Sequence, residues 1–342
     1  MQKKYLEFTG NGREYFKIWI VNLLLTILTL GIYSAWAKVR RNQYFYRNTY
    51  LAGSSFDYHA SPVTILKGRL VALLLFTAYS QSIKISITLY FVALVVLMLI
   101  LPWLIQRSLR FKLHNSSYRG LRFRFTGGLG DAYKVFLLWP LLTLFTLYML
   151  MPLSHQRLKK YQHNNSLFGQ TPFSFDAYPS DFYVIYLITF AFMVMLGLLA
   201  VVGITGLGWV GMSGFTGNPK KILIFATFVY SVIILFALFI GPYFSSRIQN
   251  LVWNKTKLGN YQFNSHIQAR KLLFIFVTNL LGIIFSLGLY QPFASVRLLK
   301  YRLESLNLQI DGDLQTFVAN QESEISATGE GAADIFDIDI SL

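Results

Sequence analysis

The chain has no cysteine among its 342 residues and carries little charge. Without cysteine it can form no disulfide, no thiolate metal site and no cysteine nucleophile. Only 13% of the residues are charged, whereas an ordinary soluble domain has about 25%. Hydrophobic residues make up 54% and aromatic residues 17%, which excludes a disordered chain, a collagen or a coiled coil. The composition therefore indicates a membrane protein.

Acidic residues are scarce until the last part of the chain. No Lys or Arg follows Arg302, and eight of the 15 acids stand beyond residue 310: Asp311, Asp313, Glu322, Glu324, Glu330, Asp334, Asp337 and Asp339. The basic, hydrophobic remainder favours contact with the phospholipid membrane and its anionic lipids. No nucleic-acid-binding motif is present, so we expect no nucleic-acid partner. The acidic tail, residues 314–342, is predicted to be disordered and available to a cytoplasmic protein partner.

Several apolar stretches reach the length of about 20 residues that a membrane-spanning helix needs. Six are clear and a seventh, at residues 66–82, is weaker; the six are residues 15–36, 85–105, 135–153, 182–202, 222–243 and 272–293. The first is not a cleavable signal peptide, because it leads into Lys38, Arg40 and Arg41 with no small-residue cleavage site. We therefore predict an all-α polytopic membrane protein with about seven apolar helices.

Comparison of the chain with itself indicates an internal repeat. Five arginines occupy equivalent positions: Arg40, Arg107, Arg157, Arg247 and Arg297. Five residues before them stand Ala35, Pro102, Pro152, Pro242 and Pro292, and four residues after them Tyr44, Phe111, Tyr161, Leu251 and Tyr301. We predict one repeated membrane domain, residues 1–313, with units at about 8–58, 59–124, 125–175, 176–262 and 265–313, followed by the tail.

Each unit is predicted to contain an apolar helix, a break, a basic amphipathic helix and a small β element. The break coincides with the repeated proline, which removes a helical hydrogen bond. A hydroxyl residue, a glycine and a phenylalanine follow in the first four units, and this pattern predicts a turn and a short strand. The phenylalanines are Phe56, Phe123, Phe173 and Phe263. We expect these β elements at the cytoplasmic interface.

Three stretches of the chain resemble the YjgN-like family of bacterial inner-membrane proteins, a family of unknown function. They are Phe8-Thr9-Gly10, residues 29–40, and Asn48-Thr49 with Gly53 and Phe56. Ala35 stands where the other four units have proline. The resemblance implies a location in the bacterial inner (cytoplasmic) membrane, and it implies no activity.

No catalytic, cofactor or metal site is predicted. The run from Gly206 to Gly211 matches a dinucleotide-binding pattern, but no acid lies between Asp181 and Glu304 to complete it. The five histidines show no metal-ligand spacing. Because no nucleophile and base stand together in a recognisable pattern, we expect a protein that is not an enzyme.

The five repeated arginines are the candidate binding residues. They could extend into lipid headgroups and set orientation, each contributing about 1 kcal/mol. Alternatively, they could encircle one site for an anionic solute or headgroup, because arginine binds phosphate bidentately and stacks on rings. The neighbouring aromatic residues in this hypothesis are Trp36, Tyr44, Trp103, Phe111 and Tyr161. The leading function is a non-enzymatic permease, channel or lipid-handling protein, and the alternative is a scaffold that binds anionic lipid through basic helices and a partner through its tail.

The topology has two possible solutions. All seven segments could cross the membrane, which would leave the basic residues on both sides. Alternatively, residues 15–36, 135–153 and 272–293 could be broken, re-entrant helices that return to the same face, with hinges near Asn22, Trp139 and Asn279. In that case only Lys84, Lys220 and Lys221 would lie on the outer side, as the positive-inside rule favours.

Overall fold

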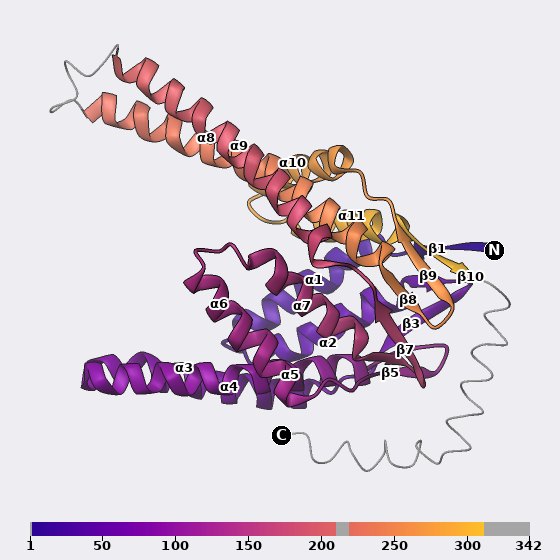
Figure 1. Cartoon of the computed structure of the whole chain (residues 1–342). Helices are drawn as coiled ribbons and strands as arrows, with labels where there is room; N and C mark the ends of the chain where they lie inside the picture. Colours follow the sequence, from indigo (N-terminus) through magenta and orange to yellow (C-terminus); the bar gives the residue numbers. More distant parts are fainter. Residues whose placement is uncertain (1, 210–218, 311–342) are drawn as a thin grey trace.

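The structure, a computed structural model, describes residues 2–209 and 219–310. Its helices extend from one end of the molecule, where all the strands gather (Figure 1). Within the described residues the helices form five hairpins: α1 (Gly12–Leu28) with α2 (Ser34–Arg47); α3 (Pro62–Ile85) with α4 (Ile87–His114); α5 (Leu129–Tyr133), the π-helical turn η1 (Lys134–Leu138) and α6 (Trp139–Phe145) with α7 (Met151–Asn164); α8 (Pro179–Trp209) with α9 (Pro219–Asn254); and α10 (Ala269–Phe285) with α11 (Gln291–Glu304).

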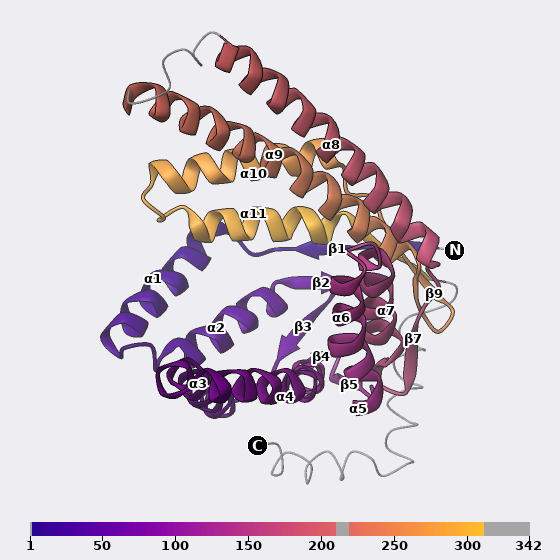
Figure 2. The same ribbon diagram turned by 60° about the vertical axis from the view of Figure 1, so that its left-hand side comes forward.

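The strands form one closed antiparallel barrel. They are β1 (Gln2–Phe8), β2 (Thr49–Leu51), β3 (Ser54–Tyr58), β4 (Ser116–Tyr118), β5 (Leu121–Phe125), β6 (Ser166–Phe168), β7 (Thr171–Phe175), β8 (Thr256–Leu258), β9 (Tyr261–Ser265) and β10 (Leu306–Ile310). Strand β1 closes the barrel because it pairs with β10 on one side, Gln2 opposite Ile310, and with β2 on the other, Phe8 opposite Thr49. The helical hairpins follow one another around this barrel (Figure 2).

The barrel interior is filled by side chains. The four phenylalanines singled out in the sequence meet there, with ring centroids 6.4 Å apart from Phe56 to Phe123, 6.4 Å from Phe123 to Phe173, and 6.1 Å from Phe173 to Phe263. They pack against a buried apolar cluster contributed by strands all around the barrel. The barrel is therefore a packed core, as expected of small barrels, and not a channel.

The predicted fold class is wrong in two respects. The β elements are not small separate additions, since they join into a closed ten-strand barrel. Among the described residues, three helices are long and apolar enough to cross a membrane, Pro62–Ile85, Ile87–His114 and Pro179–Leu198, and not about seven. The strands are three to seven residues long and pair across units, so no local pattern in the sequence reveals the closure.

Three of the predicted spans are instead short hairpins. Residues 15–36, 135–153 and 272–293 are each interrupted by a turn, at residues 29–33, 146–150 and 286–290, and both arms of each hairpin lead to barrel strands. The structure thus has the broken helices of the re-entrant alternative, but the hinges were misplaced: α1 runs through Asn22 and α10 through Asn279. Near Trp139 the helix changes from π to α without a turn.

The turns end α1, α6 and α10 in the same way. In each, a leucine has a left-handed φ: 50° at Leu30, 49° at Leu147 and 52° at Leu287. The next residue donates its backbone N–H to the carbonyl oxygen five residues earlier at 2.8 Å, as Gly31 does to Thr26. This is the Schellman arrangement that terminates many helices. The short hairpins therefore have a defined end with an apolar tip.

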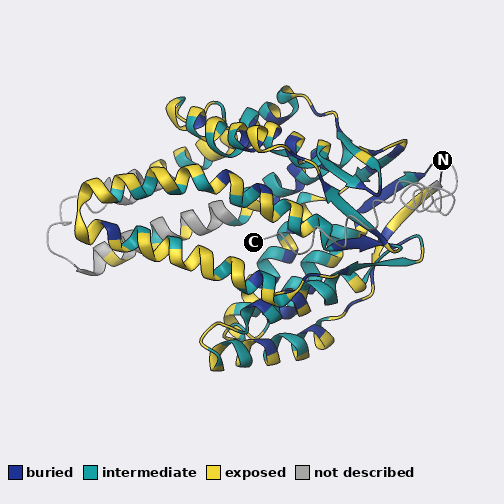
Figure 3. Cartoon of the chain, turned by 90° about the horizontal axis from the view of Figure 1, so that it is seen from below, coloured by how far each residue is buried: buried dark blue, intermediate teal, exposed yellow. Residues whose placement is uncertain are grey.

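The two long hairpins have no such break. Pro102 lies inside α4 and Pro242 inside α9, so the break predicted at these prolines is wrong for both helices. Pro152 and Pro292 stand in the first turn of α7 and α11, where a missing N–H costs no helical bond. Buried residues concentrate near the barrel, while α3, α4 and the described part of α8 bury few residues (Figure 3). The predicted tail, residues 314–342, lies outside the described residues.

Candidate functional site

Each of the five repeated arginines lies over an aromatic ring. The distances from the guanidinium carbon to the ring centroid are 5.7 Å for Arg40 and Tyr33, 6.0 Å for Arg107 and Trp103, 5.8 Å for Arg157 and Trp139, 5.3 Å for Arg247 and Tyr243, and 5.5 Å for Arg297 and Phe274. This geometry is that of cation–π contacts. Four of the arginines are exposed, and Arg297 also donates a 2.7 Å hydrogen bond to Thr278 Oγ1.

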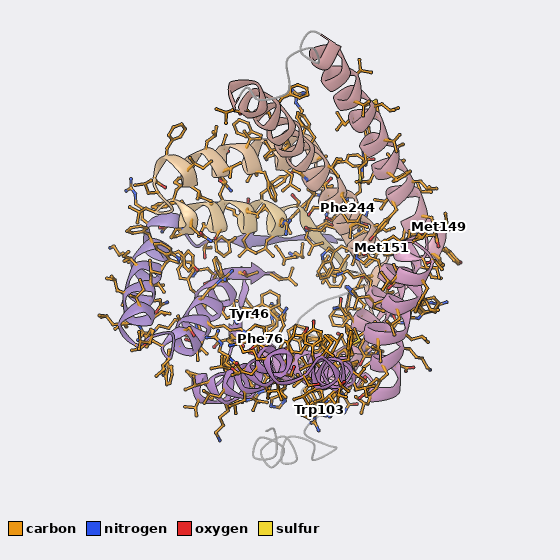
Figure 4. All side chains as sticks on the ribbon, turned by 90° about the vertical axis from the view of Figure 1, so that its left-hand side faces the viewer. Tyr46, Phe76, Trp103, Met149, Met151 and Phe244 are labelled. Atoms are coloured by element: carbon orange, nitrogen blue, oxygen red, sulfur yellow. The ribbon has the colours of Figure 1, made fainter. Side chains whose placement is uncertain are left out.

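These arginines stand on five different helices, α2, α4, α7, α9 and α11. In Figure 4, which looks from the hairpin tips toward the barrel, Trp103 beside Arg107 lies across the ring of helices from Phe244 of α9. Within the described residues no hydrogen bond or ring contact joins two of the five arginines. Each arginine therefore contacts an aromatic ring of its own hairpin, and none of these contacts joins the five arginines into one site.

Two of the predicted aromatic residues hold a hairpin to its preceding strand. The Tyr44 hydroxyl accepts from the Asn11 backbone N–H and donates to the Asn11 carbonyl, both at 2.9 Å, while the Tyr161 hydroxyl donates to the Gly128 carbonyl at 3.1 Å. Burial raises the pKa of both tyrosines to about 12. Trp36 and Phe111 pack against the apolar cluster between α2 and α3, and Trp103 is 37% exposed.

The glycine of the repeated Phe-Thr-Gly sequence is explained by the same joint. A Cβ at Gly127 would lie 2.6 Å from the Phe125 ring and 2.8 Å from the Tyr161 ring. A Cβ at Gly10 would lie 2.7 Å from the Phe8 ring and 2.9 Å from the Tyr44 hydroxyl. A side chain at Gly10 or Gly127 would therefore have to displace these rings.

Arg40 and Tyr44 also line a groove of about 550 Å³ between α1 and α2. The other lining residues are Lys17, Ile18, Val21, Gln43, Arg47 and Asn48. Lys17 and Arg47 add positive charge near the barrel end of the two helices, whereas Val21 lies further toward the apolar tip. Arg47 forms one ion pair, to Asp57 at 2.9 Å. The groove thus combines three basic side chains, Lys17, Arg40 and Arg47, with the apolar side chains of Ile18 and Val21.

The sequence analysis missed Lys17, Gln43 and Arg47. The sequence did contain a pattern that indicates Gln43 and Arg47, since these two residues and Arg40 have the i, i+3, i+7 spacing of one helix face. Lys17 could not be assigned to this groove, because only the packing of α1 against α2 brings it there. A second groove, of about 560 Å³, lies along α8 and is lined by apolar side chains, including Phe190, Val194 and Leu198.

Two histidines of α7 are buried among aromatic rings. His155 lies 3.0 Å from the Tyr186 hydroxyl and its ring packs against Phe182, while His163 stacks on Phe175. Burial, and then the charge of Lys159, lowers the pKa of each histidine to about 4. Within the described residues no three His, Cys, Asp or Glu side chains are placed to hold a metal ion.

Over residues 3–335 the chain matches the family model described as "Bacterial protein of unknown function (DUF898)", and it belongs to this family. Curated relatives include "Inner membrane protein YjgN" from Salmonella typhimurium, 32% identical over 150 residues, which are 43% of this chain and 37% of the relative. Relatives of the same name from Escherichia coli O157:H7 and strain K12 are 31% identical over 136 residues, 40% of this chain and 34% of each relative.

The matched region thus spans about a third of the length of these relatives. The YjgN-like resemblance is confirmed by the family match and by these names. No solved structure matches the chain.

Proposed function

We propose that this protein is a non-enzymatic, lipid-handling protein of the bacterial inner membrane, which binds anionic phospholipid headgroups in the groove between α1 and α2. The observation that carries the proposal is the composition of this groove. Lys17 and Arg47 stand toward its barrel end, Arg40 stands about level with Val21, and Ile18 and Val21 give the groove apolar surface beside these cations. An anionic phospholipid has matching parts, because its phosphate suits the cations and its acyl chains suit the apolar side chains.

The short hairpins have tips that suit a bilayer interior. Leu30 is 95% exposed, Leu147 84% and Leu287 94%. Each holds a left-handed backbone conformation that costs a non-glycine residue about 1 kcal/mol or more. Large apolar side chains kept at strained, exposed positions are explained by insertion into lipid, where their surface is removed from water.

Length separates the short hairpins from the long ones. Helix α1 has 17 residues, or about 25 Å at 1.5 Å per residue, which is less than the roughly 30 Å hydrocarbon core. Helices α3 and α4 have 24 and 28 residues, enough to cross. In this proposal the short hairpins dip into one leaflet, and the long hairpins α3/α4 and α8/α9 make the protein multi-pass.

The barrel is proposed to face the cytoplasm. All five hairpins begin and end at the barrel, so nearly all lysines and arginines lie toward that side. Lys84, near the far end of α3, and Lys220 and Lys221, at the start of α9, are the exceptions. The positive-inside rule then places the barrel in the cytoplasm. The names of the relatives support an inner-membrane location.

Lipid handling is favoured over a channel by the filled barrel. A pathway along the barrel axis would have to pass the packed rings of Phe56, Phe123, Phe173 and Phe263. The groove between α1 and α2 is instead open at the surface of the protein. A membrane lipid can reach such a groove laterally, without a pore.

The proposal is tested by the lipids that remain bound after purification. The double variant Lys17→Gln and Arg40→Gln is expected to retain several-fold less phosphatidylglycerol and cardiolipin than the wild type, measured by native mass spectrometry. Arg41→Gln is the matched control, because Arg41 neighbours Arg40 in sequence but lies over Phe45. Equal retention of anionic lipid in all three proteins would contradict the proposal.

A further inference from the structure

The short hairpins α1/α2 and α10/α11 place one arginine each in the same backbone setting. Arg40 and Arg297 stand on the second helix of their hairpins, nine residues after a turn glycine, Gly31 or Gly288, that has a φ of 93°. Four residues after each arginine, a tyrosine hydroxyl accepts a 2.9 Å hydrogen bond from a backbone N–H just before the first helix. The two hairpins can therefore be compared position by position, counted from the arginine.

The Arg297 guanidinium is held by its own hairpin. Its Nη1 donates to Thr278 Oγ1 at 2.7 Å and to Asn279 Oδ1 at 3.5 Å. Its central carbon lies 5.5 Å from the centroid of the Phe274 ring. All three partners belong to α10, and the Arg297 side chain is half-buried. A guanidinium N–H that donates within the protein is not available to a ligand.

Arg40 lacks the polar partners of Arg297. At the position of Thr278, α1 has Val21, whose side chain has no hydrogen-bonding group. The next residue, Asn22, is buried, and its Oδ1 has no hydrogen-bond partner in the described part of the chain. Arg40 itself is exposed, makes no hydrogen bond within the described residues, and lines the groove of about 550 Å³. Its guanidinium is therefore open to a ligand in that groove.

The two hairpins also differ in charge around the arginine. Lys17 of α1 corresponds to Phe274 of α10, 23 residues before the arginine. Arg47 of α2 corresponds to Glu304 of α11, seven residues after it, and Glu304 forms an ion pair with Lys300 at 3.7 Å. The groove of α1/α2 thus has cations in two places where α10/α11 has an aromatic ring and a carboxylate, and the carboxylate repels an anion.

The third short hairpin, which ends in α7, is an intermediate case. Leu138 stands in the place of Val21, so Arg157 has no hydroxyl partner there. Lys134, the counterpart of Lys17, forms an ion pair with Asp131 at 3.0 Å. The arginine of this hairpin is open, but the lysine beside it is neutralised, and we expect weaker anion binding there than in α1/α2.

We propose that the side chain at the position of Val21 and Thr278 decides whether the arginine of a short hairpin can bind an anionic headgroup. Val21 leaves Arg40 open in α1/α2, and Thr278 closes the corresponding place in α10/α11 by holding Arg297. The competition is direct, because a threonine hydroxyl and a phosphate accept from the same N–H groups. This inference rests on the proposed function, since it concerns the availability of Arg40 to the headgroup.

The first test changes no charge. Val21→Thr is expected to retain several-fold less phosphatidylglycerol than the wild type, because the new hydroxyl engages Arg40. The full chain is reconstituted into nanodiscs of phosphatidylcholine and phosphatidylglycerol, and the lipid that stays bound to the released protein is counted by native mass spectrometry. Val21→Ala, which has no hydroxyl, is the matched control and should retain the wild-type amount. Equal retention in Val21→Thr and Val21→Ala would overturn the inference.

The double variant Lys17→Gln and Arg40→Gln separates this inference from the proposed function. If the double variant loses phosphatidylglycerol while Val21→Thr retains it, the groove binds lipid without any influence of position 21, and only the inference fails. If the double variant also retains the lipid, the proposed function fails and the inference fails with it.

The reverse change should open the closed hairpin. The triple variant Phe274→Lys, Thr278→Val and Glu304→Arg gives α10/α11 the groove residues of α1/α2, and it is expected to bind one more phosphatidylglycerol than the wild type. The double variant Phe274→Lys and Glu304→Arg is the matched control, because it has the same charge but keeps Thr278, and it should bind less than the triple variant. An equal gain in both variants would assign the effect to charge alone, and no gain in the triple variant would show that Arg297 was not released. Either result would contradict the inference.

A measurement on the wild-type protein keeps the inference testable if a groove variant folds poorly. With isotope-labelled arginine, the guanidinium NMR signal of Arg40 is expected to shift when phosphatidylglycerol is added, whereas the signal of Arg297 should shift little because Thr278 holds it. Arg40→Lys and Arg297→Lys assign the two signals by the loss of each. A shift of the Arg297 signal as large as that of Arg40 would overturn the inference.

Discussion

The short and the long hairpins share one barrel but differ at their far ends. The short hairpin α1/α2 turns at residues 29–33, whereas the long hairpin α3/α4 continues to Ile85 before it returns. Both sets of sequences are apolar, so hydrophobicity alone does not distinguish them. The difference is made by a turn with left-handed leucines, which ends α1, α6 and α10 before they could cross a bilayer.

The two sets also differ where they join the barrel. Gly10 and Gly127 precede the short hairpins that Tyr44 and Tyr161 hold. Ala60 and Ala177 stand at the corresponding places before the long hairpins, each buried. The third short hairpin keeps the tyrosine contact, through Tyr301 and Gln268, but has Ile267 in place of glycine. The hydroxyl-to-backbone contact is therefore the shared feature of the short hairpins.

The largest expected effect concerns pH at the contact between short and long hairpins. His155 and His163 have pKa values lowered to about 4 by burial, against about 6.5 in an unfolded chain. Between these values the unfolded state binds more protons, so stability falls as the pH drops from about 6.5 to 4. Each histidine contributes up to about 1.4 kcal/mol per pH unit in this range.

Unfolding temperatures in detergent at pH 7.5, 6 and 5 measure this loss. The control is the double variant His155→Gln and His163→Gln, which should lose less stability over the same range. If the wild type and the double variant lose stability in parallel, the buried histidines are not the cause.

A glycine substitution tests the joint of the short hairpin. Gly127→Ala places a methyl group within 3 Å of the Phe125 and Tyr161 rings and should lower stability by about 1–3 kcal/mol. Gly130→Ala, three residues later where a Cβ would meet nothing, is the control. A thermal melt in which both variants match the wild type would argue against this close approach.

Removal of one hydroxyl gives a smaller effect at the same joint. Tyr161→Phe loses the bond to the Gly128 carbonyl and should reduce stability by about 1 kcal/mol. Tyr148→Phe, at the exposed tip of the same hairpin, should change stability little. Chemical denaturation of the two variants side by side checks the difference, and equal losses would contradict the structural role of Tyr161.

The smallest effect is expected in a long hairpin. Gly68 lies within α3, and a Cβ there would meet nothing within 4 Å. Gly68→Ala should therefore stabilise the protein by up to about 1 kcal/mol, because alanine favours the helix. A lowered unfolding temperature would mean that Gly68 is closely packed. The long hairpin would then resemble the short hairpins, in which Gly10 and Gly127 are closely packed.

Parts of this architecture could be predicted from the sequence because they depend on local patterns. The break predicted at Pro152 coincides with the start of α7, and the strand predicted around Phe173 is β7. The closed barrel could not be predicted, since Gln2 pairs with Ile310 over almost the whole described chain. Strand β1, at the start of the described chain, pairs with β10 at its end.

The hinges were misplaced for a physical reason. Asn22 and Asn279 stand at positions equivalent to Trp139, which precedes Pro140, but both asparagines are buried inside helices. Asn279 donates to the Ala294 carbonyl across its hairpin at 3.2 Å. The groove residue Lys17 reaches Arg40 and Arg47 only through packing between α1 and α2, which no spacing along the chain reveals.

The most direct test of the account is the side on which single cysteines react. The chain has no cysteine, so Lys84→Cys, Leu30→Cys and Asn260→Cys each carry one thiol. Lys84 lies at a long-hairpin tip, Leu30 at a short-hairpin tip and Asn260 in a barrel turn. With a membrane-impermeant reagent on intact spheroplasts, we expect labelling at position 84 alone, labelling at 260 only after the membrane is opened, and none at 30 until detergent is added. Labelling of position 30 from outside, or of 84 and 260 from the same side, would contradict the account.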